Sequence, residues 1–211
     1  MKLKTSLFDF DGVIANTEPL YDQFWNKAPL RYGLGITEMA HKIKGLTLMN
    51  ILDSYFRTSS EQIRKQVWDD CMTFEKQMDF PPVKGVLSFL RLLKGQGVKI
   101  AIVTSSGQEK MNHVFEVMKL EGLYDLLVTG DQIKKGKPAP DCFLLAAKKL
   151  ESEPEDCVVF EDSYNGIKAG LAAQMRVVGL STSNPEEKLK KYTDLVIPDF
   201  DDFTIEQYAQ L

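Results

Sequence analysis

Residues 3–12 have the sequence Leu-Lys-Thr-Ser-Leu-Phe-Asp-Phe-Asp-Gly, a short apolar-rich run that ends in Asp-Gly. This pattern predicts a β-strand over residues 3–10 that enters a tight loop. Because side chains alternate along a strand, Asp9 and Asp11 are expected to point to one side and the neighbouring phenylalanines to the other. Two carboxylates therefore stand at the end of the first predicted strand.

From residue 82 onward, predicted strands and helices alternate. The predicted strands cover 98–104, 126–129, 158–160, 175–180 and 194–197, and the predicted helices cover 86–94, 109–119, 140–150 and 165–173. Strands that alternate with helices favour a parallel sheet with helices on both faces. The sequence therefore predicts an α/β fold with a doubly wound, Rossmann-like core.

Residues 16–80 have a different character. Aromatic and methionine residues recur there at helical spacing, with breaks at Pro29 and Gly45 and with no strand-like alternation, so we expect three or four helices. A length of 211 residues suits one α/β core that carries an insertion. We predict a catalytic core over residues 1–15 and 82–211 and a small helical cap over residues 16–81.

Composition excludes several classes of partner. A net charge of −4 offers no electrostatic footprint for nucleic acid, and no apolar run reaches the ~20 residues that span a bilayer. The N-terminus meets Asp9 before any signal-peptide core can form. The three cysteines are odd in number and far apart, which implies neither a zinc site nor a disulfide framework. We expect a soluble, cytoplasmic protein without nucleic-acid or membrane partners.

Polar residues follow three of the predicted core strands, and a lysine precedes the predicted helix 140–150. In a doubly wound sheet, ligands sit at the carboxyl ends of the strands. The residues expected at this edge are Asp9, Asp11, Thr104, Ser105, Lys137, Glu161 and Asp162. Four carboxylates, hydroxyl groups and one lysine are thus predicted to converge there.

This set of charges points to a metal ion and a phosphate. Two like charges ~4 Å apart repel by roughly 4 kcal/mol at an effective dielectric constant near 20, and one lysine does not neutralise four carboxylates. A divalent cation would, and all-oxygen ligands suit Mg²⁺. A magnesium site bounded by a hydroxyl group and a lysine is suited to a small phosphorylated metabolite, with one carboxylate as nucleophile and another as acid and base.

The same segments resemble the four motifs of the haloacid dehalogenase superfamily, and in particular its branch of phosphatases and β-phosphoglucomutase-like enzymes with a small helical cap. The resemblance covers nearly the whole chain, and four motifs in this order form a specific signal. The motifs are Asp9-Phe10-Asp11-Gly12-Val13-Ile14, Ile102-Val103-Thr104-Ser105, Gly136-Lys137-Pro138-Ala139-Pro140-Asp141 and Phe160-Glu161-Asp162-Ser163.

The resemblance implies a role for each position. Asp9 would attack phosphorus to form an aspartyl-phosphate, and Asp11 would protonate the leaving oxygen and then activate water. Mg²⁺ would be held by Asp9, the backbone carbonyl of Asp11 and Asp162, with Glu161 as a ligand directly or through water.

Thr104 and Lys137 would bind the phosphoryl oxygens in the same scheme. Ser105 and Ser106 could contact the phosphate as well, or could equally cap the following helix.

Two positions distinguish the phosphatases of this branch from its mutases. In the mutase subgroup, an arginine in the cap loop holds a second phosphate and a histidine follows the first motif. Leu48 and Tyr21 stand at these places, and an apolar leucine cannot clamp a phosphate. We therefore predict a phosphatase, with a β-phosphoglucomutase-like phosphomutase as the alternative. Tyr21, Lys42 and Lys44 are predicted cap contacts to the leaving group, and a monomer is the default expectation.

Overall fold

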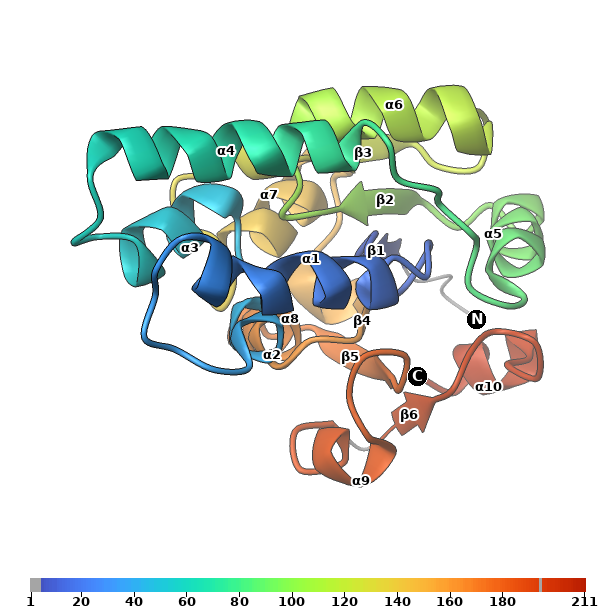
Figure 1. The fold of residues 1–211 in the computed structure, drawn as a ribbon. Helices are drawn as coiled ribbons and strands as arrows, with labels where there is room; N and C mark the ends of the chain where they lie inside the picture. The colour runs from blue at the N-terminus through green and yellow to red at the C-terminus, as the bar shows by residue number, and fades with distance from the viewer. Residues whose placement is uncertain (1–4, 194) are drawn as a thin grey trace.

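Six short strands form one parallel sheet in the computed structural model of the protein, which describes residues 5–193 and 195–211 (Figure 1). The strands are β1 (Thr5–Phe8), β2 (Ile100–Val103), β3 (Leu126–Val128), β4 (Cys157–Glu161), β5 (Arg176–Leu180) and β6 (Leu195–Ile197). Their order in the sheet is β3-β2-β1-β4-β5-β6. Because β1 and β4 are neighbours at the centre, the predicted first and fourth motifs end side by side. Predicted strand residues 3, 4 and 194 lie outside the described residues.

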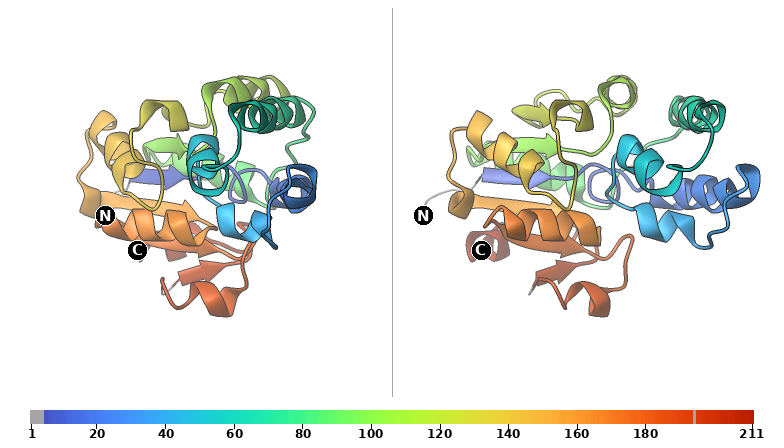
Figure 2. Two further views of the ribbon diagram at one scale, coloured as in Figure 1. Left: turned by 60° about the vertical axis from the view of Figure 1, so that its left-hand side comes forward. Right: turned by 90° about the vertical axis from the view of Figure 1, so that its left-hand side faces the viewer.

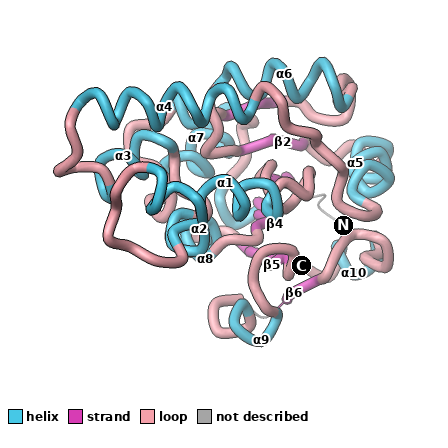
Figure 3. The backbone as a smooth tube through the Cα atoms, viewed as in Figure 1, coloured by secondary structure: helices cyan, strands magenta, loops and turns pink. Residues whose placement is uncertain are grey.

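Helices cover both faces of the sheet, which confirms the predicted α/β class (Figures 2 and 3). One face packs against α5 (Val86–Gly95), α6 (Gln108–Met118) and α10 (Ile205–Ala209), and the other against α7 (Asp141–Lys149), α8 (Tyr164–Ala172) and α9 (Glu186–Leu189). Short 3₁₀ turns cover Gly130–Gln132 and Pro154–Asp156. The five core strands and four core helices expected after residue 82 are all present, with ends shifted by one to a few residues.

Alternation along the strands divides the core into two apolar layers. In β1, Leu7 packs into the layer under α7 and α8, whereas Phe8 packs into the layer under α5 and α6. Phe8 stacks on Phe160 of β4, with ring centroids 4.5 Å apart. Phe10 belongs to the same layer as Phe8, as predicted. These buried layers hold the central strand ends in place.

The stretch between β1 and α5 folds into four helices, within the three or four predicted. They are α1 (Glu18–Arg31), α2 (Met39–Ile43), α3 (Leu48–Tyr55) and α4 (Glu61–Glu75). They bury an apolar cluster of their own around Trp25, Phe56 and Val67. The right-hand view of Figure 2 shows these helices grouped beyond the carboxyl ends of the strands.

The chain enters and leaves this helical group at one place. Ala15 and Pro82 form an antiparallel bridge, and the amide of Asn16 donates to the carbonyl of Pro81 at 2.8 Å. The amide of Val83 donates to the carbonyl of Ile14 at 2.9 Å. The helical group is therefore an insertion tethered to the core by two adjacent segments.

Within the described part of the chain, every helix is too short or too polar to cross a membrane.

Candidate active site

Asp9 lies at the end of β1 in a buried ion cluster. The ammonium of Lys137, from the loop before α7, lies 3.1 Å from Asp9 Oδ2 and 2.6 Å from Glu161 Oε1. All three side chains are at most 7% exposed. Because a buried charge is stable only when it is paired, these three groups depend on one another.

The pKa values in this cluster reflect burial and an excess of negative charge. Burial raises the pKa of Asp9 well above its usual range; Lys137 opposes this shift and Glu161 adds to it. Burial also raises the pKa of Asp162, and the charges of Glu18, Glu161 and Asp9 raise it further. Burial lowers the pKa of Lys137, but Asp9 and Glu161 outweigh burial, so that this pKa is raised overall.

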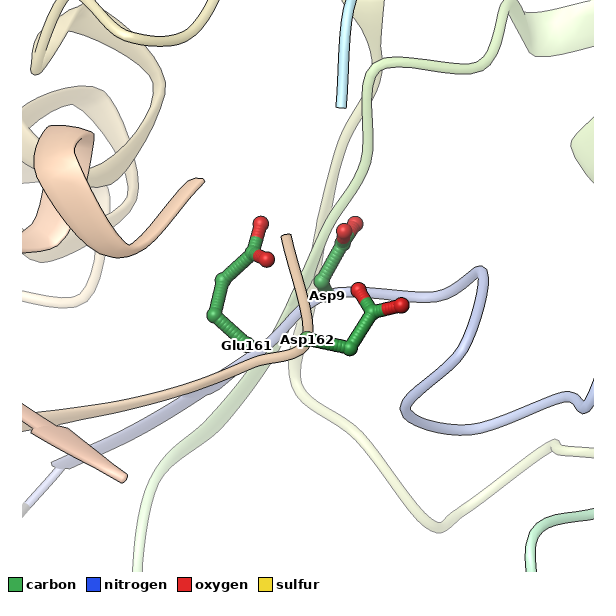
Figure 4. Close-up of side chains that lie close together, drawn as sticks. All are labelled: Asp9, Glu161 and Asp162. Carbon is green, nitrogen blue, oxygen red and sulfur yellow. The ribbon is translucent and has the colours of Figure 1, made fainter. Parts of the chain in front are cut away.

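Asp9, Glu161 and Asp162 form a buried acidic cluster of the kind that holds a cation. One carboxylate oxygen from each lies within 4.8 Å of the others, and the three side chains rise from the neighbouring ends of β1 and β4 (Figure 4). Gly12 has a φ of +75°, and a Cβ at this position would lie 2.0 Å from Asp162 Oδ2. Glycine is therefore required at position 12 both for the backbone turn and for the space beside the carboxylate.

Both oxygens of Glu161 already accept hydrogen bonds from the protein. Lys137 donates to Oε1, while the amide and the hydroxyl of Ser163 donate to Oε2 at 2.9 and 3.0 Å. The carboxylate lies against the first turn of α8, where a Cβ on Gly166 would fall 1.6 Å from Oε1. This arrangement suits an indirect contact between Glu161 and a cation better than a direct one. Ser163 also caps α8 by accepting from the Gly166 amide at 3.0 Å.

Asp11 occupies a second polar cluster, between the core and α1. Its Oδ1 accepts hydrogen bonds from Thr17 Oγ1 at 2.6 Å and from Lys110 Nζ at 2.7 Å. Its Oδ2 accepts from Lys110 Nζ at 2.6 Å and from Ser106 Oγ at 2.9 Å. Lys110 was not predicted as a site residue, because a lysine within a helix is ordinarily a solvated surface residue.

The segment after β2 contributes Thr104 and Ser105. Thr104 is 1% exposed, and its Oγ1 accepts from the amide of Ser106 at 3.0 Å. Ser105 Oγ donates to the carbonyl of Gly45 at 2.9 Å, in the loop between α2 and α3. The N-cap of α6 is Gly107, and the amide of Gln108 at the helix start donates to Asp131 Oδ2 at 2.6 Å, so the capping role considered for Ser105 and Ser106 is wrong.

A cavity of about 710 Å³ opens between these core loops and the four inserted helices. Asp9, Asp11, Thr104, Ser105 and Asp162 line it from the core side. Its position at the carboxyl ends of the strands is the expected one for a ligand in this fold class.

Two of the three predicted cap contacts line the cavity as well. Tyr21 donates its hydroxyl to Glu75 Oε1 at 2.6 Å, and Lys44 pairs with Glu18 at 2.7 Å. Burial lowers the pKa of Lys44, but Glu18, Asp22 and Asp162 together outweigh burial, so that this pKa is raised overall. Lys42 is not among the lining residues: its ammonium donates to the carbonyl of Thr37 at 3.0 Å on the exposed surface.

The segment after β5 supports the site and was not predicted. Thr182 Oγ1 donates to the carbonyl of Gly12 at 2.6 Å, and Ser183 donates to Asp162 Oδ2. Asn184 Nδ2 donates to the carbonyl of Asp162 at 3.0 Å. A run of Thr, Ser and Asn directly after a core strand is the signal that could have identified it.

Comparison with known families gives the same assignment as the motifs. The sequence model of haloacid dehalogenase-like hydrolases matches residues 6–180. The chain belongs to this family. Its predicted membership in the haloacid dehalogenase superfamily is thereby confirmed.

Named relatives of this haloacid dehalogenase-like hydrolase include phosphatases. A phosphorylated carbohydrates phosphatase from Thermotoga maritima is 34% identical over 84% of this chain and 85% of its own length. Hexitol phosphatase A from Escherichia coli is 28% identical over 97% of this chain and 95% of its own. A haloacid dehalogenase-family hydrolase structure from Entamoeba histolytica covers 98% of both chains with a TM-score of 0.83 and 26% identity. The prediction of an enzyme of this family, in its phosphoric monoester hydrolase class, is confirmed.

Proposed function

We propose that the protein is a Mg²⁺-dependent phosphatase that hydrolyses a small phosphate ester through an aspartyl-phosphate on Asp9. The observation that carries the proposal is the buried cluster of Asp9, Lys137, Glu161 and Asp162, of which Asp9 and Asp162 line the cavity together with Asp11. Within this proposal, residues 16–81 form the cap, and residues 1–15 with 82–211 form the catalytic core.

The acidic cluster fits a magnesium ion. All its donors are carboxylate oxygens, and one lysine faces three buried carboxylates, which leaves an excess of negative charge for a cation to offset. Asp9, Asp162 and the backbone carbonyl of Asp11 would hold the ion, with Glu161 in indirect contact. When bound, Mg²⁺ would lower the electrostatic cost of bringing an anionic phosphate against carboxylates.

The chain's own residues supply the covalent steps. An oxygen of Asp9 attacks phosphorus, the bond from phosphorus to the leaving oxygen breaks, and the protonated form of Asp11 gives its proton to that oxygen and becomes a carboxylate. Water then attacks the phosphorus of the aspartyl-phosphate and gives a proton to Asp11. The bond from phosphorus to Asp9 breaks, which releases inorganic phosphate and restores both carboxyl groups. Thr104, Ser105 and Lys137 bind the phosphoryl oxygens throughout.

Phosphorylated carbohydrates are the favoured substrate class. The names of the two phosphatase relatives support sugar and hexitol phosphates over nucleotides, phosphoglycolate and pyrophosphate. A cavity of about 710 Å³ accommodates a ligand of that size. Tyr21 and Lys44 on the cap wall would contact the leaving group. A cytoplasmic monomer stays a prediction.

The test is a substrate panel assayed with Mg²⁺ and with EDTA. The panel contains hexose and hexitol phosphates and β-glucose 1-phosphate, and free phosphate and glucose 6-phosphate are detected separately. We expect phosphate release that EDTA abolishes and added Mg²⁺ restores. Glucose 6-phosphate without phosphate release would identify the mutase alternative, and indifference to EDTA would remove the metal from the proposal.

A further inference from the structure

Lys110 is a buried lysine in an unfavourable position. Its side chain is 0% exposed, and it lies in the first turn of α6, where the helix dipole disfavours positive charge. Burial and the dipole both cost stability, so the position must be offset by a specific partner. Asp11 is that partner, with both carboxylate oxygens within 2.7 Å of the ammonium.

The surroundings of Lys110 hold it in one place. Its ammonium lies 5.3 Å from the ring centroid of Phe10 and 4.9 Å from that of Tyr21, over both ring faces. It also donates to Ser106 Oγ at 2.9 Å. An ammonium fixed by two rings and a hydroxyl group presents its remaining hydrogen bonds to Asp11 in a fixed direction.

Asp11 is in turn held by donors from both sides of the cavity. Thr17 approaches from the start of the inserted helices, whereas Ser106 and Lys110 approach from the core. Of these donors, Lys110 alone carries a charge. Two other carboxylates lie in the same region: burial is the main cause of the raised pKa values of Glu18 and Glu75, and the charge of Asp11 raises both further. Lys110 therefore offsets a local excess of negative charge.

We propose that Lys110 is a positioning residue: it fixes the carboxyl group of Asp11 at the place from which Asp11 serves the leaving oxygen. This inference rests on the proposed phosphatase function. It assigns no contact between Lys110 and the substrate. Lys110 acts by orienting Asp11, so its loss should weaken proton transfer to the leaving group more than binding of the phosphate.

The leaving group provides the test. An alkyl phosphate needs a proton on its leaving oxygen, whereas p-nitrophenyl phosphate releases a weakly basic phenolate that needs little help. Lys110→Met should lower kcat/KM for a hexitol phosphate by about 10²-fold and for p-nitrophenyl phosphate by less than about 10-fold. Lys110→Arg, which keeps the charge and changes the donor geometry, should give a smaller change in the same direction.

The matched control is Lys76→Met, which removes a lysine that pairs with Glu109 at 2.8 Å on the exposed surface. We expect the ratio of the two kcat/KM values to stay at the wild-type value in that variant. An equal fall for both substrates in Lys110→Met would overturn the inference, because a structural defect affects both alike. If Lys110→Met fails to fold, an unchanged ratio in Lys110→Arg overturns it equally.

A wild-type protein without phosphatase activity would instead overturn the proposed function, and this inference with it.

Discussion

Asp9 and Asp11 are two residues apart, yet each is held by its own lysine in a different way. Asp9 shares Lys137 with Glu161 in a cluster whose side chains are at most 7% exposed. Asp11 is 18% exposed and takes Lys110 together with the hydroxyl groups of Thr17 and Ser106. The two lysines come from different helix–strand units of the core.

The difference lies in the balance of charge. Lys137 faces more negative charge than it can neutralise, because Asp162 adds a third carboxylate within 4.8 Å. Lys110 pairs with Asp11 and also acts on Glu75, where burial raises the pKa and the charge of Lys110 opposes that shift. We therefore expect the proposed cation on the Asp9 side, where three buried carboxylates lie together around one lysine.

Asp9→Asn should have the largest effect on turnover. The amide is a poor nucleophile, so we expect a loss of kcat on the order of 10⁴-fold or more, with the fold intact. Steady-state phosphate release and a thermal melt measure the two quantities. Near wild-type turnover in this variant would refute the covalent mechanism.

Asp11→Asn should cost less, by about 10²- to 10⁴-fold in kcat, because it removes an acid and base and leaves the nucleophile in place. A rapid acid quench should then find phosphorylated enzyme accumulating in this variant when a substrate with a good leaving group is used. Loss of activity without any such accumulation would argue that Asp11 does not assist the water step.

Lys137→Met should lower the free energy of unfolding more than Lys110→Met does. Removing Lys137 leaves two buried carboxylates without a counter-charge, and we expect a loss of about 3–5 kcal/mol in the free energy of unfolding. Asp11 keeps its hydroxyl donors and partial exposure, so the loss for Lys110→Met should be smaller. Urea unfolding of both variants without metal measures the order, and the reverse order would contradict the charge-balance argument.

The partly exposed pair of Asp125 and Lys94 should make the smallest contribution to stability among these predictions. Asp125 pairs with Lys94 and accepts from the amide of Ile100 at 2.8 Å. Burial raises the pKa of Asp125, but these two donors outweigh burial and lower it overall. Its contribution to stability is therefore present above the unfolded pKa near 4 and is lost as the pH falls through the lower folded value.

Asp125→Asn should cost less than about 1 kcal/mol at neutral pH, since the pair is partly exposed. The difference from wild type in urea unfolding should shrink between about pH 5 and about pH 3. A difference that grows towards acid pH would show that folding does not lower the pKa of Asp125.

Residues that follow core strands could be predicted from the sequence, because a parallel sheet gathers strand ends at one edge. Asp9, Thr104 and Asp162 are of this kind, and the structure brings them to one cavity. Lys110 could not be found in this way. Its contact with Asp11 joins residues 99 positions apart, and nothing in a helical pattern says which lysine is buried.

Other differences have local causes. Lys42 and Lys44 are alike in the sequence, but only Lys44 lines the cavity. Lys42 lies within α2 and Lys44 is its C-cap, and residues two positions apart on a helix point about 200° apart. Helix α10 was not predicted, although Thr204 and Gln207 form a capping box at its start. The capping box is visible in the sequence, but the helix that follows it covers only Ile205–Ala209.

The proposed aspartyl-phosphate on Asp9 can be trapped chemically. Enzyme mixed with Mg²⁺ and a turning-over phosphate ester is quenched rapidly, reduced with borohydride and digested for peptide mass mapping. An aspartyl-phosphate is reduced to homoserine, so we expect homoserine at position 9 in the wild-type enzyme and none in enzyme without substrate. Homoserine at another position, or unmodified Asp9 under conditions where Asp11→Asn accumulates phosphorylated enzyme, would contradict it.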